Sequence, residues 1–227
     1  MSTFEPMSMS NAKCETLSTF AEIARAIGNE HRLELLNLLA QGERCVERLA
    51  QITGLSVANA SQHLQLMRRV GIVRSRRDGK NVRYRISDPS VLEMIAALHS
   101  VGEHTSDHVR AVKGDYFDVR DEESGLTPGE LVTLLDGGDI SVVDVRPEDE
   151  YAFGHIPGAM NIPFCDLASR ITELKACRRL VTYGRGPYCV TAFESVSTLR
   201  AAGFEAQRYA GGVPAWIAAG QRIECGH

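Results

Sequence analysis

Long apolar runs are missing from this 227-residue sequence. A helix that crosses a membrane needs about 18–20 consecutive apolar residues, and no segment approaches that length. The first residues, MSTFEPMSMSNAKCETLS, contain neither the basic start nor the apolar stretch of a secretory signal. We therefore expect no membrane partner and a cytoplasmic location.

Cysteine is sparse, and its positions show no regular spacing. A disulfide framework in a small secreted domain would need paired, recurring cysteines. We therefore expect reduced thiols rather than disulfides. The positions are Cys14, Cys45, Cys165, Cys177, Cys189 and Cys225.

Neither sign of charge dominates the chain, whose net charge is −4, but the charge is distributed unevenly. The first 110 residues carry 14 Lys and Arg against 12 Asp and Glu, and the remainder carry 11 against 17. Between Arg68 and Arg85, eight basic residues accompany one acid, Asp78. A chain of this length fits two domains, and the basic run is compatible with a nucleic-acid partner if its surroundings support one.

The N-terminal half has the pattern of a helix-turn-helix. Residues 15–29 and 31–40 have apolar residues at helical spacing, and residues 46–52 form a short amphipathic segment. Gly54 suits the left-handed end of that segment, and Ser56 is a good N-cap for the next helix. This arrangement predicts two helices joined by a tight turn.

The helix after Ser56, predicted to end near Val70, has an apolar face formed by Ala60, Leu64 and Met67. Its other face is polar, with the side-chain types that contact base edges and phosphates. We expect the DNA-binding residues of this helix, with its N-cap, to be Ser56, Asn59, Ser61, Gln62, Gln65 and Arg69.

A basic hairpin follows directly. Residues 72–86, IVRSRRDGKNVRYRI, alternate like two strands around Asp78-Gly79, a strong hairpin signal. Arg76, Arg77 and Lys80 lie near the predicted tip and complete the expected DNA-binding set. A helix-turn-helix followed by a basic hairpin is a winged helix.

The segment GNEHRLELLNLLAQGERCVERLAQITGLSVANASQHLQLMRRVGIVRSRRDGKNVRYRI resembles the ArsR family of winged-helix repressors, and the likeness extends over about residues 15–110. The resemblance implies a domain at residues 1–113 that forms a homodimer through its first and last helices. It also implies binding to palindromic double-stranded operator DNA and release on sensing an inducer.

The metal-binding patterns of the family are incomplete in this sequence. The Cys-Val-Cys run of many members reads Cys45-Val46-Glu47 here, and a soft metal usually needs three or four soft ligands. His99, His104 and His108 lie in the predicted last helix, where His104 and His108 would share a face. We interpret them as surface or interface residues and expect no metal and no cofactor.

Residues 114–125 have the acidic and small-residue composition of a linker, which ends at a helix cap. In residues 126–227, short apolar strands alternate with helical segments, which predicts a small parallel α/β sheet with helices on both faces. Ligands in such folds bind where strands end. We therefore place a site at the loop after the strand at 180–183.

Two stretches of this half, VVDVRPEDEYAFGHIPGAMNIP and GGVPAW, resemble a single rhodanese domain. In that family the loop after the strand begins with a catalytic cysteine. Here the position of the missing cysteine is occupied by Gly184, and Asp144 and Arg146 are expected to support the loop. The resemblance implies an anion-binding loop formed by Gly184, Arg185, Gly186, Pro187, Tyr188 and Cys189.

Sulfur transfer needs a thiolate that attacks a sulfur donor and holds the sulfur. Without a thiol at residue 184, loop amides and Arg185 can still bind an anion but cannot turn over by that route. Cys189, at the start of the next helix, is the remaining candidate for the catalytic or sensing thiol.

We therefore expect a dimeric repressor whose rhodanese-like domain senses reactive sulfur, another small oxyanion or a thiophilic species. Two alternatives stay open. One is a sulfurtransferase, which the glycine at residue 184 argues against. The other is a metal-sensing or arsenite-sensing repressor that uses Cys45 and the histidines.

Overall fold

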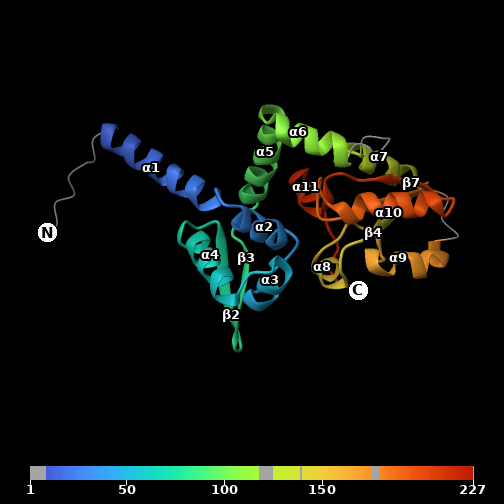
Figure 1. Cartoon of the computed structure of the whole chain (residues 1–227), viewed down its shortest axis with the longest axis horizontal. Coiled ribbons are helices and arrows are strands. Elements are labelled where there is room, and N and C mark those ends of the chain that lie inside the picture. Colours follow the sequence, from blue (N-terminus) through green and yellow to red (C-terminus); the bar gives the residue numbers. More distant parts are fainter. Residues whose placement is uncertain (1–8, 118–124, 139, 175–178, 227) are drawn as a thin grey trace. The chain divides into compact units, whose positions relative to one another are not determined.

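A computed structural model describes residues 9–117, 125–138, 140–174 and 179–226 (Figure 1). The chain divides into two compact units, Met1–Asp88 and Pro89–His227. Each unit is described by itself. Within the described residues, no helix is both long and apolar enough to cross a membrane.

The first unit is a winged helix-turn-helix, as predicted. Its three strands form an antiparallel sheet in the order β1-β3-β2. Its elements are α1 (Met9–Ile27), α2 (Glu30–Leu39), β1 (Arg44–Cys45), α3 (Val46–Thr53), α4 (Val57–Arg69), β2 (Val73–Asp78) and β3 (Asn81–Ile86).

Local chemistry explains the turn between α3 and α4. Gly54 ends α3 with φ 71°, a left-handed conformation that a glycine adopts without a Cβ penalty. The Ser56 hydroxyl then accepts a hydrogen bond from the Asn59 amide at 3.2 Å and caps α4. Ala60, Leu64 and Met67 are fully buried, so the predicted inward face of α4 is confirmed.

The wing is a regular hairpin. Asp78 pairs with Asn81, which leaves Gly79 and Lys80 as a two-residue loop, and Gly79 has φ 61°. Strand β1 was not predicted. It is only two residues long and is recognisable by its pairing with β3, where Arg44 lies opposite Tyr84.

The second unit begins with helices that the sequence predicted as a single one. Helix α5 (Ser90–Thr105) ends before Ser106, whose extended backbone (φ −106°, ψ 113°) starts a new helix, α6 (Asp107–Val112). The Ser106 hydroxyl caps α6 by accepting a hydrogen bond from the Val109 amide at 3.3 Å. A π-helical turn, Lys113–Phe117, follows α6. His104 and His108 therefore lie on different helices, and the prediction that they share a helix face was wrong.

The rest of this unit is a parallel sheet with helices on both faces, which confirms the predicted fold class. The strand order is β5-β4-β6-β7, and every neighbouring pair is parallel. The elements are α7 (Pro128–Gly137), β4 (Ser141–Asp144), α8 (Glu148–Phe153), β5 (Met160–Asn161), α9 (Phe164–Arg170), a 3₁₀ turn (Ile171–Leu174), β6 (Arg179–Tyr183), α10 (Val190–Ala201), β7 (Glu205–Arg208) and α11 (Gly212–Ala218).

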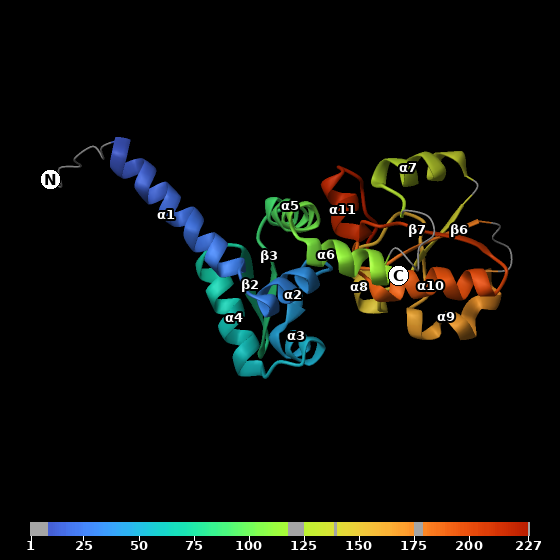
Figure 2. The ribbon, with the colours of Figure 1, turned by 45° about the horizontal axis from the view of Figure 1, so that its top comes forward.

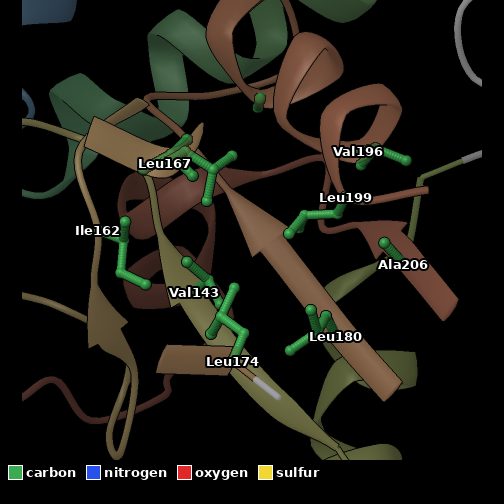
Figure 3. Close-up of a cluster of buried hydrophobic side chains, with 10 residues drawn as sticks. Val143, Ile162, Leu167, Leu174, Leu180, Val196, Leu199 and Ala206 are labelled. Carbon is green, nitrogen blue, oxygen red and sulfur yellow. The ribbon is translucent and has the colours of Figure 1, made fainter. Parts of the chain in front are cut away.

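Alternation along the strands creates two cores. Val143 of β4 and Leu180 of β6 face α9 and α10, in the cluster drawn in Figure 3. Val142 and Val181 point to the opposite face and pack with residues of α7 and α11. Figure 2 shows these two helix pairs on opposite sides of the sheet. Because the strands are parallel, their carboxyl ends lie at one edge of the sheet, and the loop after β6 begins at that edge.

The predicted linker at 114–125 overlaps residues 118–124, which lie outside the described residues. Thr127, two residues after the predicted linker, forms a capping box with Glu130 at the start of α7. Helices α5 and α6 belong to the second compact unit. The sequence had assigned them to a DNA-binding domain at 1–113, and that boundary stays a prediction.

Candidate functional site

Helix α4 presents the polar face expected of a DNA-reading helix. Ser61 is half-buried, and its hydroxyl accepts a hydrogen bond from the Gln65 side-chain amide at 3.1 Å. The other members of the predicted set are exposed. These are Ser56, Asn59, Gln62, Gln65 and Arg69.

A concave pocket of about 370 Å³ lies between α4 and the wing. Ser61, Gln65 and Arg68 line it from α4, and Arg76 and Arg77 line it from β2. Arg68 also donates a hydrogen bond to the Ser75 hydroxyl at 3.2 Å, which ties the helix to the wing. Helix and hairpin therefore form one continuous polar and basic surface.

The wing arginines differ in their surroundings. Arg76 bonds to the carboxylate of Glu43, with Nε 3.1 Å from Oε2, and Arg83 pairs with Asp78 at 2.6 Å. Within the described ranges, Arg77 and Lys80 have no ion-pair partner, and both are exposed. Arg77 and Lys80 are thus exposed cations at the tip of the wing, whereas Arg76 and Arg83 are held by carboxylates.

The candidate metal ligands do not gather. Across the described residues, no group of three His, Cys, Asp or Glu side chains could hold a metal ion. Cys45 is half-buried as the N-cap of α3, and Cys14 is exposed on α1. His99 is half-buried, and its ring packs edge-on against Tyr188, with 5.5 Å between the centroids.

The loop after β6 is closed around its glycine. Gly184 is buried, and a Cβ added to it would overlap the Cys189 sulfur and lie 3.2 Å from the Ala192 Cβ. The Cys189 amide donates to the Gly186 carbonyl at 3.1 Å, which folds the loop back on itself. The sulfur of Cys189 thus fills the space that a side chain at residue 184 would enter.

Gly212, the first residue of α11, lies against the backbone of the loop. Gly212 has φ 62°, and an added Cβ would lie 2.7 Å from the Gly184 carbonyl oxygen and 2.8 Å from the Arg185 carbonyl carbon. Only glycine permits such a close approach in that backbone conformation. The helix of the GGVPAW motif therefore packs directly against the backbone of the loop.

Arg185 has a partner that sequence reasoning missed. Its guanidinium contacts the carboxylate of Glu150 in α8, with Nη2 2.8 Å and Nε 3.1 Å from Oε1. The Glu150 side chain is buried, so this carboxylate offsets much of the arginine's charge. The acid lies in the RPEDEY segment, but nothing in its spacing singled out Glu150 from its acidic neighbours. Arg185 thus positions the loop as well as contributing charge to it.

Asp144 and Arg146 form a buried ion pair next to the loop. Arg146 Nη2 lies 2.6 Å from Asp144 Oδ2 and donates to the Gly154 carbonyl at 2.8 Å. The same guanidinium lies 5.5 Å from the ring centroid of Tyr183, the last residue before the loop. Burial raises the pKa of Tyr183 well above its usual value, with a further contribution from Asp144. The pair thus braces the strand that ends at the loop, and its function as loop support stays a prediction.

These geometries agree with comparisons to known proteins. Residues 29–75 match the bacterial regulatory protein, arsR family, and residues 127–219 match the rhodanese-like domain. The chain is 40% identical over 218 residues to the HTH-type transcriptional regulator Rv0324 of Mycobacterium tuberculosis, covering 96% of this chain and 95% of that protein.

Two solved structures are similar to separate parts of the chain. The homodimeric winged helix-turn-helix DNA-binding domain Mb0332 (residues 1–100) from Mycobacterium bovis is 35% identical, with a TM-score of 0.42, and covers 46% of this chain and 95% of that one. The rhodanese-like domain of the Anabaena protein Alr3790 is 34% identical, with a TM-score of 0.41, and covers 45% and 80%.

The winged helix-turn-helix and the rhodanese-like sheet define a transcriptional regulator with two kinds of domain. The chain belongs to the ArsR family of bacterial regulatory proteins, and its C-terminal half is a rhodanese-like domain.

The close contact between Gly184 and Cys189 predicts that a larger side chain at residue 184 destabilises the protein. Gly184→Ala should lower the free energy of unfolding by about 1–3 kcal/mol, because the added methyl overpacks the space held by the Cys189 sulfur. Urea unfolding followed by the fluorescence of Trp216, the single tryptophan and a buried residue of this unit, measures the change.

The matched control is Gly184→Ala combined with Cys189→Ala, which removes the sulfur and should recover most of the loss. Cys189→Ala alone supplies the baseline. If Gly184→Ala is as stable as the parent chain, the loop is not closed around residue 184 as described.

Proposed function

We propose that this regulator is a repressor that binds palindromic operator DNA as a homodimer in the cytoplasm, and that the loop at 184–189 responds to reactive sulfur. The observation that carries the sulfur-sensing role is the position of the Cys189 sulfur. It lies within the loop, in the space left by the side chain that Gly184 lacks. The loop therefore keeps a thiol although its first residue has none.

Operator binding is supported by the surface of the first unit. An exposed helix with Asn59, Gln62 and Gln65 offers the donors and acceptors that read base edges in the major groove. The wing adds the exposed cations Arg77 and Lys80, which suit the phosphate backbone. In this proposal α4 enters the major groove and the wing contacts the adjacent backbone.

Dimer formation is supported by apolar side chains that the single chain leaves uncovered. Leu17 and Phe20 on α1 are 56% and 60% exposed. On α5, Leu98 and Val101 are exposed as well. Exposed apolar clusters on helices indicate a contact surface, and the family resemblance assigns dimer contacts to the first and last helices.

The proposed sensing step is a thiol–polysulfide exchange at Cys189. The Cys189 thiolate attacks one sulfur of a polysulfide and forms a new S–S bond. The S–S bond of the donor breaks, and its electron pair leaves on the shortened polysulfide anion. The protein then carries additional sulfur at Cys189, whose own sulfur already occupies the space beside Gly184.

A sulfurtransferase remains the second candidate, because Cys189 is a thiol in the loop that carries the family's catalytic cysteine, although at a different residue from the family's. It differs from the sensor in requiring release of the sulfur to an acceptor such as cyanide. The metal-sensing alternative would use Cys45 and the histidines, and the loop at 184–189 has no part in it.

The wing assignment predicts a specific loss of DNA binding. The double variant Arg77→Ala/Lys80→Ala should weaken binding to all sequences alike, because both residues are assigned to phosphates. The slope of log affinity against log salt should fall by about one unit for each lost contact. The measurement is a fluorescence-anisotropy titration at several salt concentrations.

The charge-matched control Arg170→Ala/Arg222→Ala removes two cations from the second unit and should leave the slope unchanged. An Arg77→Ala/Lys80→Ala variant with the affinity and slope of the parent chain would contradict the wing assignment.

The sensing role predicts that polysulfide changes operator affinity through Cys189. With an operator fragment selected from random DNA by the parent chain, polysulfide should weaken binding about 5–150-fold, the usual range of allosteric coupling. Cys189→Ser should abolish the effect, because a hydroxyl cannot form the S–S bond.

Cys165→Ser, which removes an exposed thiol, is the control and should respond like the parent chain. Thiocyanate release from thiosulfate and cyanide, measured in parallel, separates the two candidates. Sustained turnover without any change in DNA affinity would favour the sulfurtransferase over the sensor.

A further inference from the structure

Tyr188 is the loop residue whose contacts extend away from the loop. Its hydroxyl donates a hydrogen bond of 2.6 Å to Oε1 of Glu103, a residue of helix α5. Its ring meets that of His99, also on α5, with centroids 5.5 Å apart and an interplanar angle of 82°. Both partners belong to the same compact unit as the loop.

The contact continues on both sides of Tyr188. Oε2 of Glu103 accepts a hydrogen bond from Lys113 Nζ at 3.1 Å, so the carboxylate is held between a tyrosine and a lysine. Phe117 packs against Tyr188 at 5.5 Å and against Phe193 of α10 at 5.0 Å. The Tyr188 cluster, defined as His99, Glu103, Lys113, Phe117 and Tyr188, therefore connects the loop to α5 and to the π-helical turn.

The hydrogen bond between Tyr188 and Glu103 is charge-assisted. The hydrogen bond from Tyr188 lowers the pKa of the Glu103 carboxyl, and Lys113 lowers it further against the effect of burial. Burial and the same carboxylate raise the pKa of Tyr188. At neutral pH a protonated phenol thus donates to an ionised carboxylate, which makes a short and directional bond.

The position of Tyr188 in the chain links this bond to the thiol. Tyr188 directly precedes Cys189, and the Cys189 amide is already bonded to the Gly186 carbonyl. The Cys189 sulfur lies beside Gly184, in the space that a Cβ at residue 184 would enter. In the proposed coupling, sulfur added to Cys189 displaces residues 188–189 from this position, and Tyr188 moves with them.

Helix α5 is well placed in the sequence to carry such a change. It starts at Ser90, after β3 of the wing ends at Ile86. It also carries the exposed Leu98 and Val101 that the proposed function assigns to the dimer contact. Because α5 both follows the wing in the chain and is assigned to the dimer contact, a shift of α5 would affect both.

We propose that Tyr188 is the positioning residue that couples the loop to α5, and that its hydrogen bond to Glu103 transmits the state of Cys189 to the DNA-binding half. This inference rests on the proposed sensing function. When Cys189 carries added sulfur, the loop shifts, the bond to Glu103 is lost, and α5 changes its position. Operator affinity falls as a consequence.

The test uses the full-length chain and Tyr188→Phe, which keeps the aromatic packing and removes the donor. The readout is the ratio of operator dissociation constants with and without polysulfide, measured together with the sulfur content of Cys189 by mass spectrometry. The parent ratio should lie in the range of about 5–150 typical of allosteric coupling, and Tyr188→Phe should bring it to within about twofold of one. Cys189 should still gain sulfur in the variant.

Tyr151→Phe is the matched control. It loses a tyrosine hydrogen bond of similar length, 2.7 Å to the Ala159 carbonyl, on α8 rather than α5. It should keep the parent ratio. A purely structural role of Tyr188 would lower stability or sulfur uptake but would leave the ratio unchanged.

Glu103→Gln tests the same bond from the α5 side and leaves the loop sequence intact, so it covers the case in which Tyr188→Phe folds poorly. Its ratio should also fall towards one. A full polysulfide response in Tyr188→Phe or Glu103→Gln, with Cys189 modified, overturns the coupling and leaves the sensor intact. A parent chain whose DNA affinity ignores polysulfide overturns both proposals.

Discussion

The space beside Gly184 is the constraint on which the C-terminal site depends. The Cys189 sulfur fills that space, and Gly212 lies against the backbone of residues 184–185. A side chain at residue 184 and the present position of Cys189 exclude each other. The loop therefore differs from the expected rhodanese loop by more than a missing side chain. The sulfur of Cys189 occupies the space that a side chain at residue 184 would enter.

Two further contacts hold this arrangement in place. The buried pair of Asp144 and Arg146 lies beside Tyr183 at the end of strand β6, and Glu150 pairs with Arg185. Because the arginine is paired with a buried carboxylate, the positive potential at the loop is weaker than the sequence suggested. A loop of this kind suits exchange at a thiol better than tight binding of a free anion.

Much of the fold could be predicted because local signals and hydrophobic pattern agree. Gly54 and Ser56 mark the turn between α3 and α4, Asp78-Gly79 marks the wing, and the alternation of strands and helices after residue 126 marks the parallel sheet. The prediction of a single long helix near residue 100 was wrong, because the chain leaves the helical conformation at Ser106. A serine inside an apolar pattern is compatible with a helix, and the break is visible only in its backbone angles.

The sequence located the loop of the candidate site but not the contacts that the loop makes. The loop at 184–189 follows from the strand before it and the helix after it. The pairing of Tyr188 with Glu103 joins residues 85 positions apart, and no periodicity reports such a contact. The crowding between Gly184 and Cys189 is likewise a property of the folded loop, because sequence alone does not state which side chain occupies a shared space.

The most direct test of this account is to map which cysteine takes up sulfur first. Cys14, Cys165 and Cys225 are exposed, whereas Cys189 is half-buried, so accessibility alone would favour the other three. Brief treatment of the native protein with limiting polysulfide, followed by peptide mass spectrometry, ranks the six thiols. The account predicts that Cys189 is modified before the exposed cysteines. Preferential modification of the exposed cysteines, with Cys189 unchanged, would contradict it.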